Sequence, residues 1–439
     1  MSGSITLIDE DSVWRAVELL LDDDDICSLL SCGSMLECVT LPSALFRAAA
    51  QCGKLRALHL LWCDFELADA VQLLATTTSL SELSLVLNNH QIVFRHRVAE
   101  LLAGGVAQCS SLTSLTLLDA FSTELMTAPI ETPAALCRFL ERDQLCSLTL
   151  ACGFVDSSSL HGQLSTSVFA SVSRCARLQA LDLRGNARML IAECDVSTFI
   201  GALTQLSQLT ALSVASCCVT TDVSVRVLNS LSGSLQQLDL TNNHAIDCAV
   251  MLPALTRFLA RAHAMRSLSL VGVVLSGAQL EVLFDAMAQT FCWEDFHLGG
   301  VDVTDVTQIE MNSLLSIMQR SRRLARVGLY DFQLSDAQRQ RILATVEAFC
   351  FELTEFDVLL TWTAEENDAL AALLERNESL SWSTLRPALT DVCFGLAPLG
   401  LPTLLVVAVF DELHGAHDTN LFVKWTVASR ICEDPRVFS

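Results

Sequence analysis

Lysine is almost absent from this 439-residue sequence: Lys54 and Lys424 are the only two, so arginine carries nearly all of the positive charge. Lysine and arginine together number 27 against 50 acidic residues, which gives a formal net charge of −23. A chain this acidic repels nucleic-acid backbones and anionic membrane surfaces. We therefore expect neither nucleic acid nor a membrane as a partner, and either a basic protein surface or a partner that is not steered by charge is favoured instead.

Motifs that bind nucleotides or activate a nucleophile are also missing. The sequence has no G-x-G-x-x-G, no P-loop and no G-x-S-x-G pattern, and it has no C-x-x-C pair. His414, His417 and Asp418 could hold a metal by residue type, but their position at a turn after a predicted helix favours a solvated loop. The sequence therefore predicts a protein that is not an enzyme, with no catalytic residue, no cofactor and no metal.

A secretory signal is a further absence, since residues 1–12 are acidic and lack a basic region followed by an apolar core. The 18 cysteines are therefore expected to be reduced thiols in a cytoplasmic or nuclear protein. Several occupy positions that favour a small buried group: Cys63 and Cys217 stand where Asn186 and Asn243 stand in their own repeats. We interpret these cysteines as packing residues rather than reactive ones.

What the sequence does contain is a repeated leucine pattern. Residues 178–186, LQALDLRGN, read L-x-x-L-x-L-x-x-N, and residues 235–243, LQQLDLTNN, repeat it. On a strand, Leu181 and Leu183 point to one face while Asp182 points to the other. The asparagine that ends each copy can bond backbone groups of the following turn. One such unit leaves its apolar face uncovered and needs stacked neighbours.

Related copies recur at intervals of about 30 residues, which leaves room for a helix between strands. They begin at Leu55, Leu80, Leu112, Leu145, Leu178, Leu209, Leu235, Met265, Trp293, Leu324 and Leu353. Ser276, Thr304 and Ser335 are suited to cap such helices. The predicted fold is α/β: a horseshoe-shaped leucine-rich-repeat solenoid with parallel strands on the concave face and helices on the convex face. Residues 36–382, about twelve repeats, resemble the ribonuclease-inhibitor-like class of leucine-rich-repeat proteins.

The two ends of the chain differ from the repeats. Residues 1–35 are predicted to form a helical cap, and VELLLDDDDICSLLSCGS within them resembles the middle of an F-box through Asp25, Ile26 and Leu29. The leucine-proline pair that opens an F-box is missing, so a plain cap and an F-box-like segment remain alternatives. Residues 383–439 are predicted to form a helical C-terminal cap. A long uncharged run within them is interrupted by prolines and glycines, which favours cap helices over a membrane span.

The residues that alternate with the strand leucines are predicted to line the concave face, where a solenoid offers an extended platform for a partner. Early strands carry small uncharged residues there, whereas later strands carry charged or aromatic ones. Tyr330 is the single tyrosine of the chain, and tyrosine and arginine are favoured anchors in interfaces. The predicted partner-binding residues are Asp182, Arg184, Asp239, Asp295, His297, Arg326, Tyr330 and Asp357.

Three functions are compatible with this pattern. The leading hypothesis is an intracellular, non-enzymatic scaffold that binds a protein partner on the concave face. The second is a ubiquitin-ligase adaptor, in which an F-box-like N-terminus binds a Skp1-like protein and the repeats hold a substrate. The third is an enzyme regulator similar to ribonuclease inhibitor, which the acidity, length and cysteine content favour and the irregular repeat lengths disfavour.

Overall fold

The computed structural model divides into two compact units, Met1–Met265 and Arg266–Ser439. It describes residues 40–41, 43–51, 55–61, 64–87, 101–119, 131–151, 163–187, 189–290, 292–299, 308–321, 323–330, 332–350, 352–358 and 362–380. Outside the described residues lie the predicted end segments 1–35 and 383–439, together with Cys63, Thr304, His414, His417 and Asp418.

The first unit is a run of short parallel strands that alternate with helices. Its strands are β1 (Thr40–Leu41), β2 (Ala57–Leu61), β3 (Asp64–Phe65), β4 (Glu82–Leu87), β5 (Ser114–Asp119), β6 (Ser147–Ala151), β7 (Ala180–Asp182), β8 (Ala211–Ser213) and β9 (Gln237–Asp239). Its helical segments are α3 (Ser43–Gln51), α4 (Leu67–Thr76), the π-helical η2 (Leu101–Val106), α6 (Glu131–Leu140), α7 (Gln163–Val172), α8 (Glu193–Gln205), α9 (Thr221–Ser230) and α10 (Cys248–Arg261). β2 and β4 to β9 pair in parallel in this order, while β1 pairs with β3.

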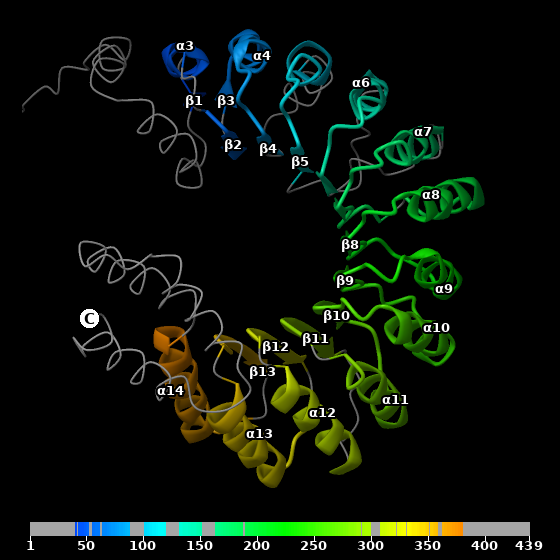
Figure 1. The fold of residues 1–439 in the computed structure, drawn as a ribbon, viewed down its shortest axis with the longest axis vertical. Helices are drawn as coiled ribbons and strands as arrows, with labels where there is room; N and C mark the ends of the chain where they lie inside the picture. The colour runs from blue at the N-terminus through cyan, green and yellow to red at the C-terminus, as the bar shows by residue number, and fades with distance from the viewer. Residues whose placement is uncertain are drawn as a thin grey trace, which may run out of the picture. The chain divides into compact units, whose positions relative to one another are not determined.

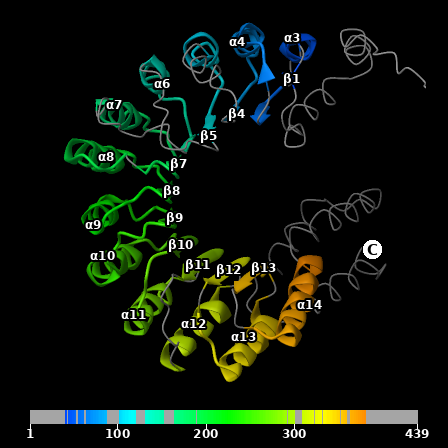
Figure 2. The ribbon, with the colours of Figure 1, turned by 180° about the vertical axis from the view of Figure 1, so that it is seen from behind.

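The second unit repeats the same plan. Its strands are β10 (Ser267–Val271), β11 (Asp295–Gly299), β12 (Arg326–Tyr330) and β13 (Glu355–Val358), and they pair in parallel in chain order. Its helices are α11 (Gly277–Met287), α12 (Gln308–Arg320), α13 (Asp336–Phe349) and α14 (Ala364–Leu380). In each unit the strands lie along one side and the helices along the other (Figure 1, Figure 2). The predicted α/β leucine-rich-repeat fold is therefore confirmed.

The leucines of the repeat motif form the core. In the repeat that gave the clearest pattern, the side chains of Leu178, Leu181 and Leu183 are at most 2% exposed. The register pairs Leu181 with Leu212, and Leu212 with Leu238, so equal motif positions stack from strand to strand. Burying one such side chain stabilises the fold by about 1.5–3 kcal/mol. No single repeat could bury its leucines without these neighbours.

Side-chain caps begin two helices of the second unit at the predicted residues. The backbone N–H of Ser276 donates to Gln279 Oε1 at 2.7 Å, which forms a capping box at the start of α11. The N–H of Ser335 donates to Gln338 Oε1 at 2.8 Å in the same way at α13. Both bonds satisfy donors that the first helical turn leaves unpaired, so these two predicted caps are confirmed.

A buried asparagine closes the turn after β9. The Asn243 Nδ2 donates to the carbonyls of Val214 at 3.0 Å and Leu240 at 2.9 Å. Its Oδ1 accepts from the N–H groups of Cys217 at 3.2 Å and Val219 at 2.9 Å. A fifth bond runs from Nδ2 to the Thr241 carbonyl at 3.4 Å, so one fully buried side chain pairs five backbone groups of two neighbouring repeats.

A thiol takes this position in the preceding repeat. Asn186 donates to the carbonyls of Leu150 and Leu183, both at 2.6 Å. Cys217 stands at the equivalent place one repeat later, and its thiol donates to the Leu183 carbonyl at 3.0 Å. The side chain is 1% exposed, so its predicted packing role is confirmed.

Three other cysteines are also packed rather than poised for chemistry. Burial raises the pKa of the Cys175, Cys248 and Cys350 thiols to about 12. A thiol with a raised pKa stays protonated at neutral pH, and the thiolate is the reactive form. These residues therefore behave as small apolar groups with a weak donor.

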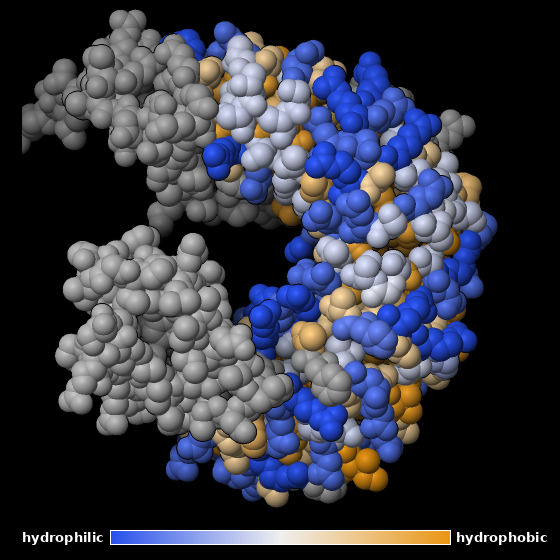
Figure 3. All heavy atoms as spheres, in the orientation of Figure 1, coloured by the Kyte–Doolittle hydropathy of each residue, from blue (hydrophilic) through white to orange (hydrophobic). Residues whose placement is uncertain are grey.

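Large apolar side chains are exposed in both units, with Ile191 in the first unit the most exposed at 71%. Val282 of α11 is 48% exposed and Ile309 of α12 is 59% exposed. Figure 3 shows hydrophobic residues scattered among hydrophilic ones over the described surface. Across the described part of the chain, none of the helices combines the length and the apolar character that a membrane crossing needs.

We expect Asn243→Ala to lower the free energy of unfolding by about 1–3 kcal/mol, because it leaves buried backbone groups of two repeats without partners. Urea unfolding followed by circular dichroism measures the change. Asn229→Ala, at an exposed position of α9, is the matched control and should leave stability nearly unchanged. Equal effects of the two substitutions would show that the turn bonds contribute nothing specific.

Candidate functional site

The strand face of the second unit carries two rows of side chains between the buried apolar ones. The first row runs across the four strands through Ser267, Asp295, Arg326 and Glu355. The second row runs through Ser269, His297, Gly328 and Asp357. Leu268 and Leu270 on β10, by contrast, are fully buried. Because side chains alternate between the faces of a strand, both rows lie on the face away from the helices.

The first row is a chain of alternating charges. The Ser267 hydroxyl donates to Asp295 Oδ1, and the Arg326 guanidinium donates to Asp295 Oδ2 at 3.0 Å. The bond with Asp295 raises the pKa of Arg326 above its ordinary value. The Arg326 side chain nevertheless remains 53% exposed, and Glu355 on the next strand is exposed as well. The row thus presents one oriented cation between two carboxylates.

The second row holds Tyr330 in place. Tyr330 ends β12, and its hydroxyl donates to Asp357 Oδ2 at 2.8 Å while lying 3.4 Å from His297 Nδ1. The His297 and Tyr330 rings are stacked, with centroids 6.2 Å apart and planes 21° apart. Gly328 makes room for both rings, because a Cβ at this position would fall on His297 Nδ1 and lie 2.6 Å from Tyr330 Cε2. The phenol therefore bridges three strands.

The backbone below Tyr330 also depends on a glycine. Gly299 has a φ of +135°, a region that side chains rarely adopt, and an added Cβ would overlap the Tyr330 carbonyl oxygen. Burial first, and then the bond to Asp357, raises the pKa of Tyr330 to about 12. Tyr330 is therefore a neutral hydrogen-bond donor at neutral pH, in an orientation fixed by its neighbours.

The predicted residues of the first unit have a different role. Asp182 Oδ1 accepts from the backbone N–H of Arg184 at 3.0 Å, and its Oδ2 accepts from Arg184 Nε at 2.7 Å. Asp239 Oδ1 accepts from the N–H of Thr241 at 3.0 Å, and its Oδ2 accepts from the Ser213 hydroxyl at 3.0 Å. Both carboxylates accept hydrogen bonds from the turn that follows their strand. Much of their hydrogen-bonding capacity is therefore used inside the fold.

The structure thus brings five of the eight predicted residues together in the second unit, as a pair and a trio. The pair is Asp295 with Arg326, and the trio is His297, Tyr330 and Asp357. Three contributors were absent from the predicted set: Gly328, Glu355 and Ser267. Gly328 had a usable signal, because an isolated glycine inside a strand pattern marks a close approach of another group.

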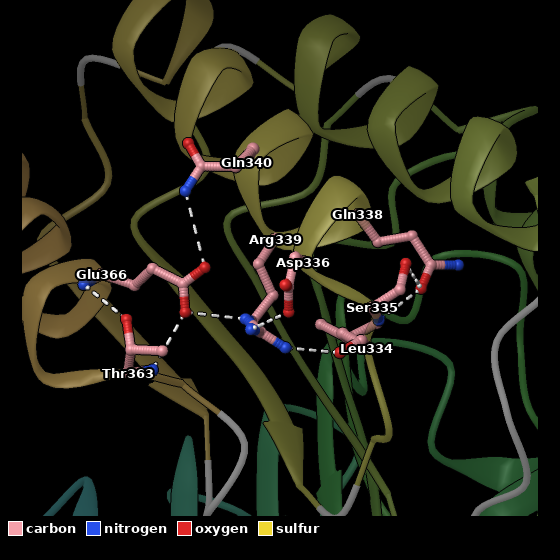
Figure 4. Close-up of polar contacts among 8 residues, drawn as sticks. All are labelled: Leu334, Ser335, Asp336, Gln338, Arg339, Gln340, Thr363 and Glu366. Carbon is pink, nitrogen blue, oxygen red and sulfur yellow. Dashed lines mark hydrogen bonds and ion pairs between the residues drawn. The ribbon is translucent and has the colours of Figure 1, made fainter.

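A separate polar cluster joins the last two described helices. The buried Arg339, 6% exposed, donates through Nε to Glu366 Oε2 at 2.8 Å. It also donates to the Leu334 carbonyl and to Asp336 Oδ1, both at 2.6 Å. Glu366 Oε2 further accepts from the N–H of Thr363 at 2.9 Å. Figure 4 shows how this guanidinium fastens the start of α14 to the start of α13, so the cluster supports the fold rather than a binding surface.

Metal binding finds no support in the described part of the chain, where no group of three or more His, Cys, Asp or Glu side chains could hold an ion. Comparisons with known proteins match the sequence to no family model and to no curated protein.

Several solved structures are similar to this chain, and three of them follow. An internalin from Listeria monocytogenes is 14% identical, with 84% of this chain and 93% of that chain covered and a TM-score of 0.39. A chain of the yeast Rad7 and Elc1 complex is 15% identical, with coverages of 80% and 89% and a TM-score of 0.49. The leucine-rich-repeat-containing protein LegL7 from Legionella pneumophila is 13% identical, with coverages of 75% and 94% and a TM-score of 0.39. Sequence identities this low show a similarity of fold alone.

Acid should weaken the Arg339 cluster through Glu366. The bond from the Thr363 N–H first, and then Arg339, lower the pKa of the Glu366 carboxyl. A carboxyl whose pKa is lowered by folding stabilises the protein above its unfolded pKa, near 4.3, and this stability is lost as pH falls through the folded value. We expect the urea midpoint to fall in that window and to depend less on pH in Glu366→Gln. Glu365→Gln, an exposed neighbour, should keep the wild-type dependence, and identical curves for all three proteins would contradict the assignment.

Tyr330 allows a direct test of the second row, because it is the only tyrosine. We expect its ultraviolet phenolate band to appear with a pKa of about 12, and Asp357→Asn to lower that pKa, since the variant removes a carboxylate that disfavours the phenolate. Circular dichroism at each pH verifies that the chain stays folded. Ionisation of the wild-type phenol near pH 10, the ordinary value, would show that Tyr330 is free in solvent.

Proposed function

We propose that this chain is a non-enzymatic scaffold that binds a protein partner across the strand face of its second unit. The observation that carries the proposal is the fixed orientation of Tyr330 and Arg326 there, each held by a carboxylate from a neighbouring strand. Tyrosine and arginine are enriched among the residues that contribute most to binding. A cytoplasmic or nuclear location belongs to the same proposal.

Both side chains are oriented before any partner arrives. Asp295 bonds the Arg326 guanidinium, and Asp357 bonds the Tyr330 hydroxyl. Ordering a flexible side chain in an interface costs about 0.5–1.5 kcal/mol. Arg326 and Tyr330 are already partly ordered in the free protein, so binding has less of this cost to overcome. They are therefore better suited as interface anchors than the exposed side chains of the helices.

The partner surface is expected to be basic. The two rows contain the carboxylates of Asp295, Glu355 and Asp357 against the single guanidinium of Arg326, and the whole chain has a net charge of −23. Complementary potentials speed association and penalise competitors of like charge. An acidic or nucleic-acid partner is disfavoured on the same ground.

We expect the double variant Arg326→Ala/Tyr330→Ala to bind its partner at least about tenfold more weakly, the effect of losing one strong anchor. Proteins that co-purify with the full chain from its native cell are quantified first, and calorimetry then gives the affinity of the identified partner. The control Arg257→Ala/Phe349→Ala removes the same kinds of side chain from exposed positions on α10 and α13. Unchanged affinity of the first variant, with wild-type urea midpoints throughout, would move the interface elsewhere.

Two other hypotheses keep their own tests. The adaptor hypothesis depends on residues 12–34, outside the described residues, and requires co-purification of a Skp1-like protein that is lost when residues 1–35 are deleted. The enzyme-regulator hypothesis requires inhibition of a basic ribonuclease, and the acidic rows of the second unit are compatible with such a target. Absence of both activities leaves the general scaffold as the simplest account.

A further inference from the structure

We propose that His297 makes the strand face of the second unit sensitive to pH, because it gains a proton beside Tyr330 and then weakens the attraction for a basic partner. This inference rests on the proposed function and names how that same site is regulated. The nitrogen that gains the proton is His297 Nε2, since the hydrogen bonds of the second row assign Nδ1 to Tyr330.

The His297 ring is packed into the second row of the strand face. The register sets it between Ser269 on β10 and Gly328 on β12, and it is half-buried. Its ring stacks on that of Tyr330, with centroids 6.2 Å apart and planes 21° apart. A Cβ at position 328 would fall on His297 Nδ1, so this nitrogen lies directly over Gly328. A change in the charge of His297 therefore acts at once on the Tyr330 ring.

The hydrogen bonds of Tyr330 decide where the His297 proton lies. A phenol has one proton to donate, and the Tyr330 hydroxyl donates it to Asp357 Oδ2 at 2.8 Å. In the 3.4 Å contact between the Tyr330 oxygen and His297 Nδ1, Nδ1 must therefore be the donor. A neutral imidazole carries one N–H, so Nε2 is left unprotonated. It can take up a proton without breaking either bond.

The other titratable groups of the two rows come from β11, β12 and β13, whereas β10 contributes serines at these positions. They are Asp295, Arg326, Tyr330, Glu355 and Asp357. The three carboxylates outweigh the one guanidinium by two charges, and an imidazolium at His297 reduces this excess to one. Because association with a basic partner depends on complementary potentials, protonation of His297 weakens it.

Among the described groups of the two rows, His297 is the one suited to respond near neutral pH. Histidine is the side chain whose charge ordinarily changes between about pH 5 and 8. Aspartate and glutamate ordinarily titrate at about pH 4, tyrosine at about pH 10 and arginine at about pH 12 or above. A change of pH within the histidine range therefore alters the charge of His297 and leaves its neighbours as they are.

The single tyrosine makes the test site-specific. The full-length chain, labelled with ring-¹³C tyrosine, gives nuclear magnetic resonance signals from the Tyr330 ring alone. We expect these signals to move in one step between about pH 5 and 8, and His297→Gln to abolish the step. The control His263→Gln, at an exposed position of the first unit, should keep it. No step in the wild type, or a full step in folded His297→Gln, would overturn the proposal.

A second measurement needs no variant. In the wild-type chain labelled with ring-¹⁵N histidine, the nitrogen signals distinguish the two neutral tautomers from the imidazolium. We expect one of the nine histidines to hold its proton on Nδ1 when neutral and to titrate with the same midpoint as the Tyr330 signals. The absence of such a histidine contradicts the assigned proton positions, whether or not His297→Gln folds.

Calorimetry with the partner identified by co-purification extends the test to binding. We expect the wild type to bind it more weakly at about pH 5.5 than at about pH 7.5. The loss of affinity between these two values should be about threefold smaller in His297→Gln, the size expected of one partly exposed charge. Titration of the partner itself affects both proteins equally and cancels in this comparison. The same loss in folded His297→Gln is an overturning result.

The titration and the partner experiments fail in different ways. If partner capture depends on Arg326 and Tyr330 but the Tyr330 signals show no step, the pH response is wrong and the scaffold stands. If His297 and Tyr330 titrate together but capture ignores Arg326 and Tyr330, the coupled pair exists and the proposed function is wrong.

Discussion

Register is the constraint on which the rest of each unit depends. Because Leu212 pairs with Leu181 on one side and Leu238 on the other, buried leucines meet buried leucines along the first unit. A slip of one residue would send every leucine of a strand to the solvent face. The same register arranges the intervening side chains in rows on the opposite face. The candidate site is therefore a consequence of core stacking. The number of residues between a strand residue and the motif leucine of the same strand decides in which row its side chain lies.

Position in the motif does not by itself decide what a polar residue does. Asp182 and Asp357 both stand between two apolar strand residues, yet Asp182 bonds the turn after its own strand while Asp357 bonds Tyr330 on the neighbouring strand. The difference lies in the hydrogen-bond donors that each carboxylate can reach. Asp182 has the Arg184 side chain two residues away, whereas Asp357 has a phenol that Gly328 allows to lie across the sheet. One carboxylate stabilises a turn and the other presents an anchor.

This explains how far the sequence alone could go. The recurring leucine motif predicts the fold and the stacked core, because equal motif positions pair from strand to strand. The caps at Ser276 and Ser335 are predictable because each depends on residues close in sequence. The sequence also selects Tyr330 and Arg326 as candidate anchors, by residue type. It cannot show that Asp295 and Asp357 hold them, because these bonds join strands about 30 residues apart and their geometry depends on neighbouring repeats. The predicted ribonuclease-inhibitor-like class stays a prediction because the general repeat does not distinguish it, and the F-box-like segment stays one because residues 1–35 lie outside the described residues.

Net charge is a weaker guide to recognition than the pairing of individual charges. The chain carries −23 overall, but Asp182 is paired with Arg184, and Asp295 with Arg326. These carboxylates contribute to the long-range field that steers a basic partner and have little capacity left for a direct bond. Glu355 differs because its side chain stays exposed, although it stands opposite Arg326 in the register and its charge contributes to the raised pKa of Arg326. Attraction over distance thus depends on all of these carboxylates, whereas direct contact with a partner depends on the acidic side chains that the fold leaves exposed.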